Sequence, residues 1–214
     1  MKKLFLIIFL LPLFTIFGQR IGELAPEKPH IKFPDNTWGV DLLFGEGGFG
    51  LGTFYRYQFN DKLNGSVDLS FSESKDDREI ERFDFFGRPL PTFGKKNRVF
   101  LIPLNFGLQY RLFYESLTDN LRPFVNFGVG PSMVVTTPAS LEYFKSFGKA
   151  HAKFAVGGYI GIGGNFGLSK RNLVGINFRY YVIHLFDNGV ENFFNSFVKN
   201  ISSFYFSISF GIMY

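Results

Sequence analysis

Five charged residues stand alone within otherwise apolar stretches of this sequence: Asp41, Arg56, Asp68, Arg111 and Arg179. Each has an apolar or aromatic residue on both sides, so a strand would direct the charge to one face and its neighbours to the other. Charges of both signs in an enclosed space must pair, because an unpaired buried charge is strongly destabilising. We therefore expect these residues to form one charge network inside the protein, either as a salt-bridged plug or as a path for a solute or proton.

Histidine and cysteine add little further chemistry. The sequence has no cysteine, and none of its three histidines, His30, His151 and His184, forms a pair at a spacing typical of zinc ligands. The absence of cysteine excludes disulfides and a thiol nucleophile. We expect neither a metal site nor a cofactor.

The segment Gly45-Glu46-Gly47-Gly48-Phe49-Gly50 matches the letters of a dinucleotide-binding fingerprint. Such a site needs a helix after the glycines, whose N-terminus holds the phosphates. No helical pattern follows here. We interpret the segment as a glycine-rich connection between two strands.

The composition indicates which elements carry these residues. Phenylalanine and tyrosine number 31 and 10, and aromatic residues reach 20% of the chain. The mean hydropathy is only +0.07, well below that of a helical membrane protein. Strands that place aromatic groups on one face and polar groups on the other account for both values.

Alternation with a period of two is the dominant signal along the chain. Bulky apolar residues occupy one face of each alternating segment, whereas glycine, serine, asparagine and the isolated charges occupy the other. The segments are 38–44, 49–59, 63–74, 100–112, 125–133, 154–168, 174–182 and 203–214. Small polar groups inward and large apolar groups outward are typical of a small membrane barrel. We predict an all-β fold: an eight-stranded antiparallel up-and-down transmembrane β-barrel over residues 36–214.

The N-terminal residues have the layout of an export signal. Lys2 and Lys3 form a positive start, an apolar stretch follows, and Gly18 is a small residue suited to cleavage. We predict a signal peptide over 1–18 and a proline-containing periplasmic lead-in over 19–35. Removal of the leader lowers the formal charge from +5 to +3. No basic stripe of the kind that binds nucleic acid is present.

Connections of two lengths separate the predicted strands. Short turns fall at 60–62, 114–120 and 169–172, and long loops at 75–98, 136–150 and 186–196. Short periplasmic turns and longer outer loops are the usual asymmetry of outer-membrane barrels. The segment 45–48 is either the first outer turn or a bulge within one long strand, and the second possibility would make the strand count odd.

The chain resembles the small outer-membrane barrel proteins of the OmpX and OmpA-membrane-domain type, in particular the phenylalanine-rich members of Bacteroidota. The resemblance covers residues 36–214 as a pattern. Its most specific element is the C-terminal alternation of apolar residues that ends on an aromatic residue: Phe206, Ile208, Phe210, Ile212 and Tyr214. The resemblance implies a location in the bacterial outer membrane, contact with outer-membrane lipid and lipopolysaccharide, and recognition of the last strand by the barrel-assembly machinery.

Two further features bear on activity. Outer-membrane lipid A deacylases carry a His-x-Ser-Asn motif, and after His184 the residue at the nucleophile position is Phe186. In the loop 75–98, aromatic residues stand among charges, and Phe83, Phe85, Phe86 and Arg88 are candidate contacts for an external ligand. We expect a non-enzymatic barrel with an envelope or surface-binding role. A narrow solute channel is the first alternative and a lipid-modifying enzyme the second.

Overall fold

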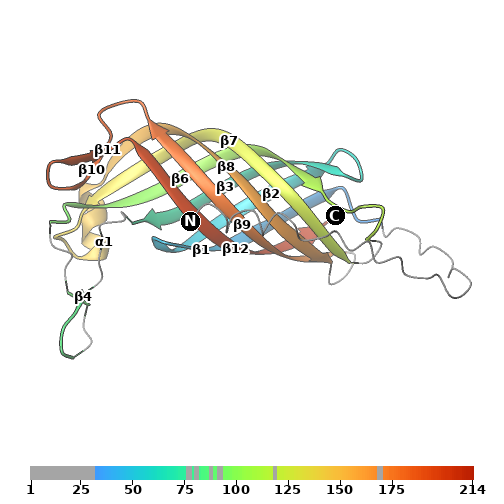
Figure 1. Cartoon of the computed structure of the whole chain (residues 1–214), viewed down its shortest axis with the longest axis horizontal. Helices are drawn as coiled ribbons and strands as arrows, with labels where there is room; N and C mark the ends of the chain where they lie inside the picture. The colour runs from blue at the N-terminus through green and yellow to red at the C-terminus, as the bar shows by residue number, and fades with distance from the viewer. Residues whose placement is uncertain are drawn as a thin grey trace, which may run out of the picture.

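The structure is a computed structural model that describes residues 32–75, 79, 82–86, 89–90, 94–117, 120–167 and 171–214. Eight strands form a closed barrel in the order β1-β12-β9-β8-β7-β6-β3-β2, and every neighbouring pair is antiparallel (Figure 1). The barrel strands are β1 (Asn36–Gly45), β2 (Gly48–Gln58), β3 (Leu63–Ser74), β6 (Asn97–Arg111), β7 (Leu121–Pro138), β8 (His151–Gly167), β9 (Asn172–Leu185) and β12 (Asn200–Met213). The predicted eight-stranded up-and-down barrel is therefore confirmed. The expected signal peptide lies outside the described residues, as does most of the lead-in.

The first hairpin settles the strand count. Gly45 pairs with Gly48, so Glu46 and Gly47 form a two-residue turn rather than a bulge. Gly48 has a φ of +117°, a conformation that side chains rarely adopt. A Cβ on Gly47 would lie 1.8 Å from the carbonyl oxygen of Glu73, so only glycine fits against the neighbouring strand. The glycine-rich segment is a hairpin turn.

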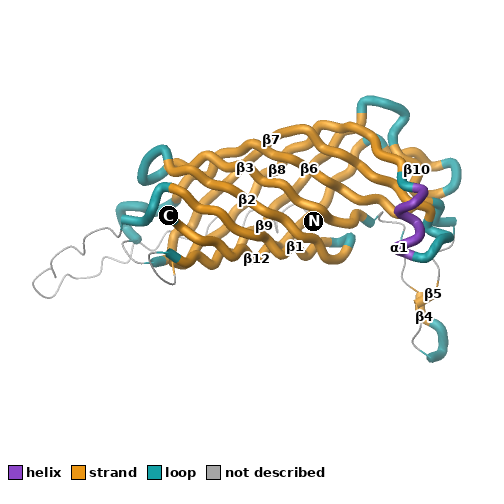
Figure 2. Tube along the Cα trace, turned by 180° about the vertical axis from the view of Figure 1, so that it is seen from behind, coloured by secondary structure: helices purple, strands orange, loops and turns teal. Residues whose placement is uncertain are grey.

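The two ends of the barrel differ in their connections. The strands β2, β6, β8 and β12 end on the side of the barrel that carries the C-terminus (Figure 1), whereas the two-residue turn at 46–47 lies at the opposite end. The opposite end also carries the small elements β4 (Arg82–Phe83), β5 (Pro89–Leu90), α1 (Tyr143–Ser146), η2 (Phe147–Lys149), β10 (Val190–Phe193) and β11 (Ser196–Val198) (Figure 2). By the asymmetry of such barrels, we name the loop-rich end extracellular and the other end periplasmic. Among the described residues, no helix is both long and apolar enough to cross a bilayer.

Five strands extend further toward the extracellular end than their alternation predicted: β6, β7, β8, β9 and β12. β7 and β8 contain 18 and 17 residues, and Thr136 still pairs with His151 above the apolar band. The loop between them therefore spans 139–150 rather than 136–150. Backbone pairing continues beyond the apolar band because each strand still has a neighbouring strand on both sides. The backbone hydrogen bonds do not require apolar residues on the outer face.

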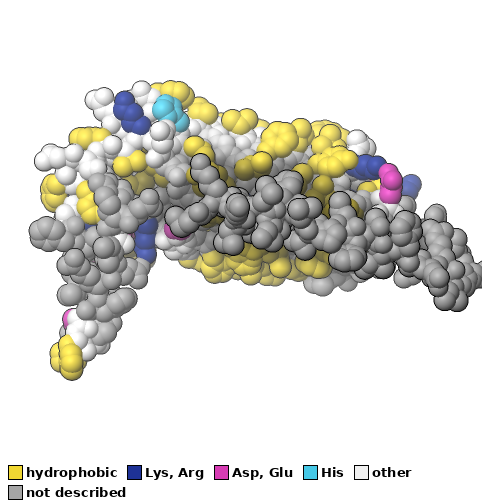
Figure 3. Space-filling model, in the orientation of Figure 1, with side chains coloured by type: hydrophobic (Ala, Val, Ile, Leu, Met, Phe, Trp, Pro, Cys, Tyr) yellow, Lys and Arg dark blue, Asp and Glu magenta, His cyan; other side chains and the backbone are white. Residues whose placement is uncertain are grey.

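The two faces of the wall follow the predicted alternation. Bulky apolar side chains cover the outside, and Figure 3 shows them along the wall, with lysine and arginine near the two ends. Phe100 is the exception. It points outward as predicted, but it is fully buried because Tyr143 and Phe147 of the extracellular loop cover it, with ring centroids 5.9 Å and 5.2 Å away.

The outward face of β12 predicts that the cost of a charged substitution depends on its depth in the bilayer. Ile208 lies on β12 opposite Leu42 and Ile176, and Ser202 lies on the same face six residues closer to the extracellular end. Arginine costs ~2–4 kcal/mol at the bilayer midplane and ~0–1 kcal/mol near the interfaces. We therefore expect Ile208→Arg to lower the folded fraction in liposomes much more than Ser202→Arg, as measured by heat-modifiable migration. Equal tolerance of the two arginines would show that this face is not in contact with lipid.

The closing seam between β1 and β12 yields a second prediction. The Tyr214 backbone N–H donates to the Asn36 carbonyl over 2.9 Å, and the Asn36 N–H donates back over 3.2 Å. Each such bond contributes ~0.5–1.5 kcal/mol. Deletion of Tyr214 should lower the amount of folded barrel in the outer membrane, whereas Tyr214→Phe, which keeps the backbone and the ring, should not. Unchanged assembly of the deletion variant would contradict a role for the terminal residue.

Candidate functional site

The middle of the lumen contains a buried charge layer. The Arg179 guanidinium on β9 lies 3.3 Å from Asp41 of β1 and 3.5 Å from Asp68 of β3. All three side chains are at most 5% exposed. One arginine thus bridges two carboxylates from distant strands, and removing it would leave two unpaired buried charges.

Hydroxyl groups complete the coordination of these carboxylates. Ser209 donates a hydrogen bond to Asp41, and Asp68 accepts hydrogen bonds of 3.0 Å from both Ser66 and Tyr159. Arg179 also donates to the hydroxyl of Tyr181 over 3.3 Å. Buried charges are stabilised when hydrogen bonds satisfy their remaining lone pairs, as here.

Arg56 lies next to this layer on its periplasmic side. Its guanidinium stacks 4.0 Å above the ring of Phe54 and donates to Asn165 over 3.4 Å. It makes no ion pair within the described part of the chain, although Asp41 and Asp68 attract its charge. Arg56 and Arg179 therefore balance Asp41 and Asp68 in number, which keeps the middle of the lumen neutral.

Arg111 was expected in the same network, and the structure places it elsewhere. It is the last residue of β6, at the periplasmic mouth, where it donates to the carbonyl of Leu117 over 3.3 Å and lies 4.9 Å from the ring of Tyr114. Its position near a strand end puts it too far along the barrel axis to reach the central carboxylates. The structure thus brings together Asp41, Asp68 and Arg179, with Arg56 beside them and Arg111 apart.

A layer of tyrosines lies on the extracellular side of the charges. Tyr159, Tyr181 and Tyr205 are buried with Leu43, and their ring centroids are 5.1 Å and 5.5 Å apart in succession. The hydroxyl of Tyr205 also shares a 2.8 Å hydrogen bond with Ser72 across the lumen. Glycine in the wall provides the room, since a Cβ on Gly128 would lie 2.6 Å from the Tyr159 ring.

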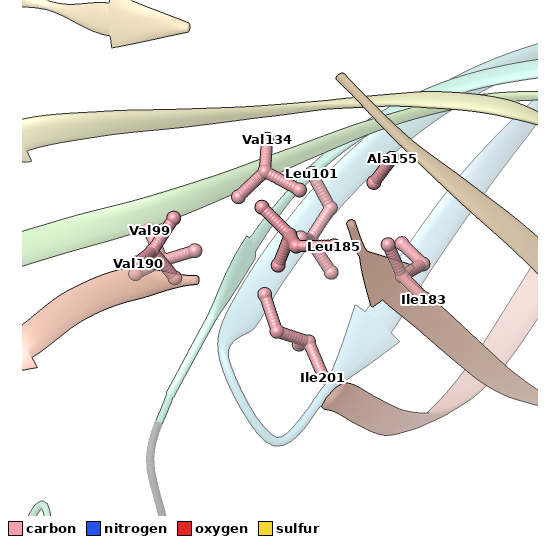
Figure 4. Packing of buried hydrophobic residues seen from close by; sticks show 8 residues of the cluster. All are labelled: Val99, Leu101, Val134, Ala155, Ile183, Leu185, Val190 and Ile201. Atoms are coloured by element: carbon pink, nitrogen blue, oxygen red, sulfur yellow. The ribbon is translucent and has the colours of Figure 1, made fainter. Parts of the chain in front are cut away.

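An aliphatic layer closes the extracellular part of the lumen (Figure 4). Seven of its side chains come from barrel strands, and Val190 comes from the β10–β11 hairpin: Val99, Leu101, Val134, Ala155, Ile183, Leu185, Val190 and Ile201. Our sequence analysis missed this layer. The signal was a loss of alternation, as in 99–102 and 133–135, where apolar residues occupy both faces of a strand.

Four of the five residues predicted to form the C-terminal assembly signal lie on the outside of β12, and the fifth, Tyr214, follows the strand. Phe206, Ile208, Phe210, Ile212 and Tyr214 alternate with buried or half-buried inward residues. The Phe206 ring contacts Phe178 on the neighbouring β9, with centroids 5.1 Å apart. The pattern therefore forms part of the apolar outer wall at the seam.

The candidate loop contacts lie beyond the extracellular rim. Phe85 and Phe86 are 99% and 78% exposed, and their rings meet edge to face at 5.6 Å. Phe83 belongs to β4, and Arg88 lies outside the described residues. The structure brings two of the four residues into contact with each other.

His184 points outward near the extracellular rim. It shares a 2.6 Å hydrogen bond with the side chain of Asn200, and its ring lies 5.4 Å from that of Phe186. Among the described residues, no hydroxyl group forms a hydrogen bond with His184. No group of three potential metal ligands occurs in the part of the chain that the structure describes.

Several solved structures of small outer-membrane proteins are similar to this chain. Neisserial surface protein A is 12% identical, with a TM-score of 0.50 and coverage of 84% of this chain and 94% of that chain. The N-terminal β-barrel domain of OprF from Pseudomonas aeruginosa is 11% identical, with a TM-score of 0.47 and coverage of 85% and 98%. Ail, the attachment invasion locus protein of Yersinia pestis, is 12% identical, with a TM-score of 0.40 and coverage of 82% and 95%. At such low identity, the likeness concerns the fold alone.

Sequence comparison is more specific. No curated protein sequence matches the chain. The pattern of the outer membrane protein beta-barrel domain, however, matches residues 28–210, which is most of the chain. Together with the closed barrel and its apolar outer face, this match places the protein in the bacterial outer membrane. The chain belongs to the outer membrane protein beta-barrel domain family.

Proposed function

We propose that this protein is a non-enzymatic outer-membrane barrel that acts at the cell surface, by binding a partner through its extracellular loops. The observation that carries this proposal is the filled lumen. Charge, tyrosine and aliphatic layers occupy the lumen from its middle to its extracellular end. An eight-stranded barrel is narrow enough for inward side chains to fill it.

The layered lumen argues against the channel alternative. The cavity between the tyrosine and aliphatic layers, bounded by Leu43, Leu101 and Tyr205, has a volume of about 10 Å³. A single water molecule needs at least about 10–15 Å³ on the same measure. The small size of this cavity supports a lumen that is closed to solutes.

The enzyme alternative has less support. A serine hydrolase needs a nucleophile activated by an adjacent base. His184 instead pairs with Asn200 and faces the outside of the barrel beside Phe186. Its surroundings favour an interfacial position among aromatic residues over a catalytic one.

The extracellular loops expose aromatic side chains on elements that are packed and hydrogen-bonded to the barrel. Phe144 of α1, Phe194 and Phe197 are 80%, 65% and 59% exposed. The helix is anchored on Phe100, and the β10–β11 hairpin is tied to the start of β6 by a 2.7 Å hydrogen bond from the Lys96 N–H to the Asn192 carbonyl. Exposed apolar groups held by rigid elements are typical of binding surfaces.

Ion pairs at the extracellular end indicate which kind of partner the loops could bind. Lys95, Lys96, Lys145 and Lys153 each form an ion pair with a nearby carboxylate. The hydrogen bond from Lys96 holds the pKa of Glu191 below its usual value, so this pair stays charged at neutral pH. These four lysines already have anionic partners, and the exposed aromatic rings near them are available for contact. An apolar protein surface fits the rings better than a row of phosphates does.

Lipid and lipopolysaccharide around the wall, and the assembly machinery at β12, remain expected partners on the strength of the family resemblance.

Conductance tests the closed lumen. Purified wild-type protein in planar bilayers should show no stable open state. The variant Arg179→Met/Asp68→Asn, which removes one charge of each sign and leaves Asp41 beside Arg56, should also be silent because the aliphatic layer still closes the lumen. Steady, ion-selective conductance in the wild type that disappears in this variant would instead favour the channel. Heat-modifiable migration of both proteins provides the folding control.

Capture from intact cells tests the loops. Cross-linking followed by mass spectrometry should enrich a surface protein with the wild type. The variant Phe85→Ser/Phe86→Ser/Phe144→Ser should reduce its recovery about tenfold or more, since loss of a few central aromatic contacts removes most of the binding energy. The matched control is Glu142→Ser/Lys145→Ser, which removes an exposed ion pair from the loop that contains Phe144. This control should recover as much of the partner as the wild type does. Equal recovery with the aromatic variant would contradict the proposal.

A further inference from the structure

The periplasmic mouth of the barrel contains a polar cavity that the proposed surface role does not use. Its volume is about 210 Å³. Three cations, Lys32, Arg111 and Arg122, and two carboxylates, Asp35 and Asp61, line it together with the amides of Gln109 and Asn165. It lies on the periplasmic side of the charge layer, so it is separate from the loops by the whole height of the filled lumen.

Arg56, Arg111 and Arg122 lie close together at this end, where Asp61 attracts the charge of Arg111, and Asp41 and Asp68 attract that of Arg56. Arg122 on β7 stacks 3.8 Å above the Phe33 ring, and the charges of both Arg111 and Arg56 repel it. None of the three forms an ion pair with Asp35 or Asp61 within the described part of the chain. Like charges brought together in a partly buried site are unfavourable unless an anion compensates them.

Several buried polar atoms at the mouth have no hydrogen-bond partner. These atoms are the Nε atoms of Arg111 and Arg122, the Nη2 atom of Arg56 and the Oε1 atom of Gln109. Arg56 and Gln109 are each only 4% exposed, so water does not reach them freely from outside the barrel. Native proteins rarely leave such groups unsatisfied, so the three arginine N–H donors are available to an acceptor that enters the cavity.

The donors belong to a rigid frame. Arg111 and Arg122 extend inward from the adjacent strands β6 and β7, where Arg111 pairs with Phe124 and Arg122 with Asn165. Asn165, which pairs with Arg122 across the ladder, accepts a hydrogen bond from Arg56 and so links these two arginines. Guanidinium groups present forked N–H donors that match the oxygens of phosphate.

We propose that the periplasmic mouth binds a phosphate-type oxyanion, held by Arg122 and Arg111 with Arg56 behind them. The cavity has room for such a group, since a water molecule occupies about 30 Å³ in the liquid. Its position admits two sources with the same chemistry. One is a soluble phosphate or phosphate ester of the periplasm, and the other is the headgroup of an anionic phospholipid in the inner leaflet.

The test follows the arginine Nε–H resonances of the mature protein by heteronuclear NMR in lipid nanodiscs. One arm adds inorganic phosphate to nanodiscs of zwitterionic lipid, against chloride at the same ionic strength. The other arm replaces part of the zwitterionic lipid with phosphatidylglycerol and adds no phosphate. Arg122→Gln removes the central donor, and Lys145→Gln removes one positive charge at the opposite end of the barrel as the matched control.

A saturable shift of the Arg111 and Arg122 signals is expected in at least one arm. A shift with phosphate identifies a soluble ligand, and a shift with phosphatidylglycerol alone identifies a headgroup. Arg122→Gln should weaken binding about tenfold or more, as followed on Arg111, because one charge-assisted contact is lost. Lys145→Gln should bind as the wild type does. Absence of a shift in both arms, or equal binding by Arg122→Gln and Lys145→Gln, would overturn the proposal.

Discussion

Closing eight strands into a barrel satisfies the hydrogen bonds of the wall, and it also creates a narrow interior that side chains must fill. In this protein the bridge from Arg179 to Asp41 and Asp68 ties together three strands, β9, β1 and β3, that the ladder of the wall does not join directly. The charges are tolerable in the interior because they balance in number and because serine and tyrosine hydroxyls complete their coordination. The other inward residues are arranged around this bridge.

The lumen changes in character along its axis. Aliphatic side chains and a valine from a loop hairpin close the extracellular end, tyrosines and charges occupy the middle, and arginines surround an open cavity at the periplasmic end. This gradient separates the two proposed activities in space. A ligand at the periplasmic mouth and a partner at the loops would contact the same molecule without sharing a residue.

The outer wall and the loops divide the aromatic residues between two tasks. Those on the wall contact lipid and one another, as in the Phe206–Phe178 pair, and they account for the unusual composition. Those on the extracellular elements, such as Phe144, are exposed to water, although the loop around them is packed on Phe100. Aromatic surface in water has a free-energy cost that contact with a partner would recover.

The sequence alone determined the fold class, the two faces and the location, because a period of two assigns each residue to lipid or lumen without reference to any other strand. Only the pairing of Gly45 with Gly48 decided the strand number. It also supplied the residues of the charge layer. It could not say which of them meet, because the height of an inward residue depends on the stagger between strands that only barrel closure fixes. For that reason Arg179 reaches Asp41 and Asp68, whereas Arg111, equally isolated in the sequence, lies at the mouth with Arg122. Closure likewise decided that apolar runs such as 99–102 have their inward residues in a packed aliphatic layer, since only neighbouring strands can place Leu101 beside Val134, Ile183 and Leu185.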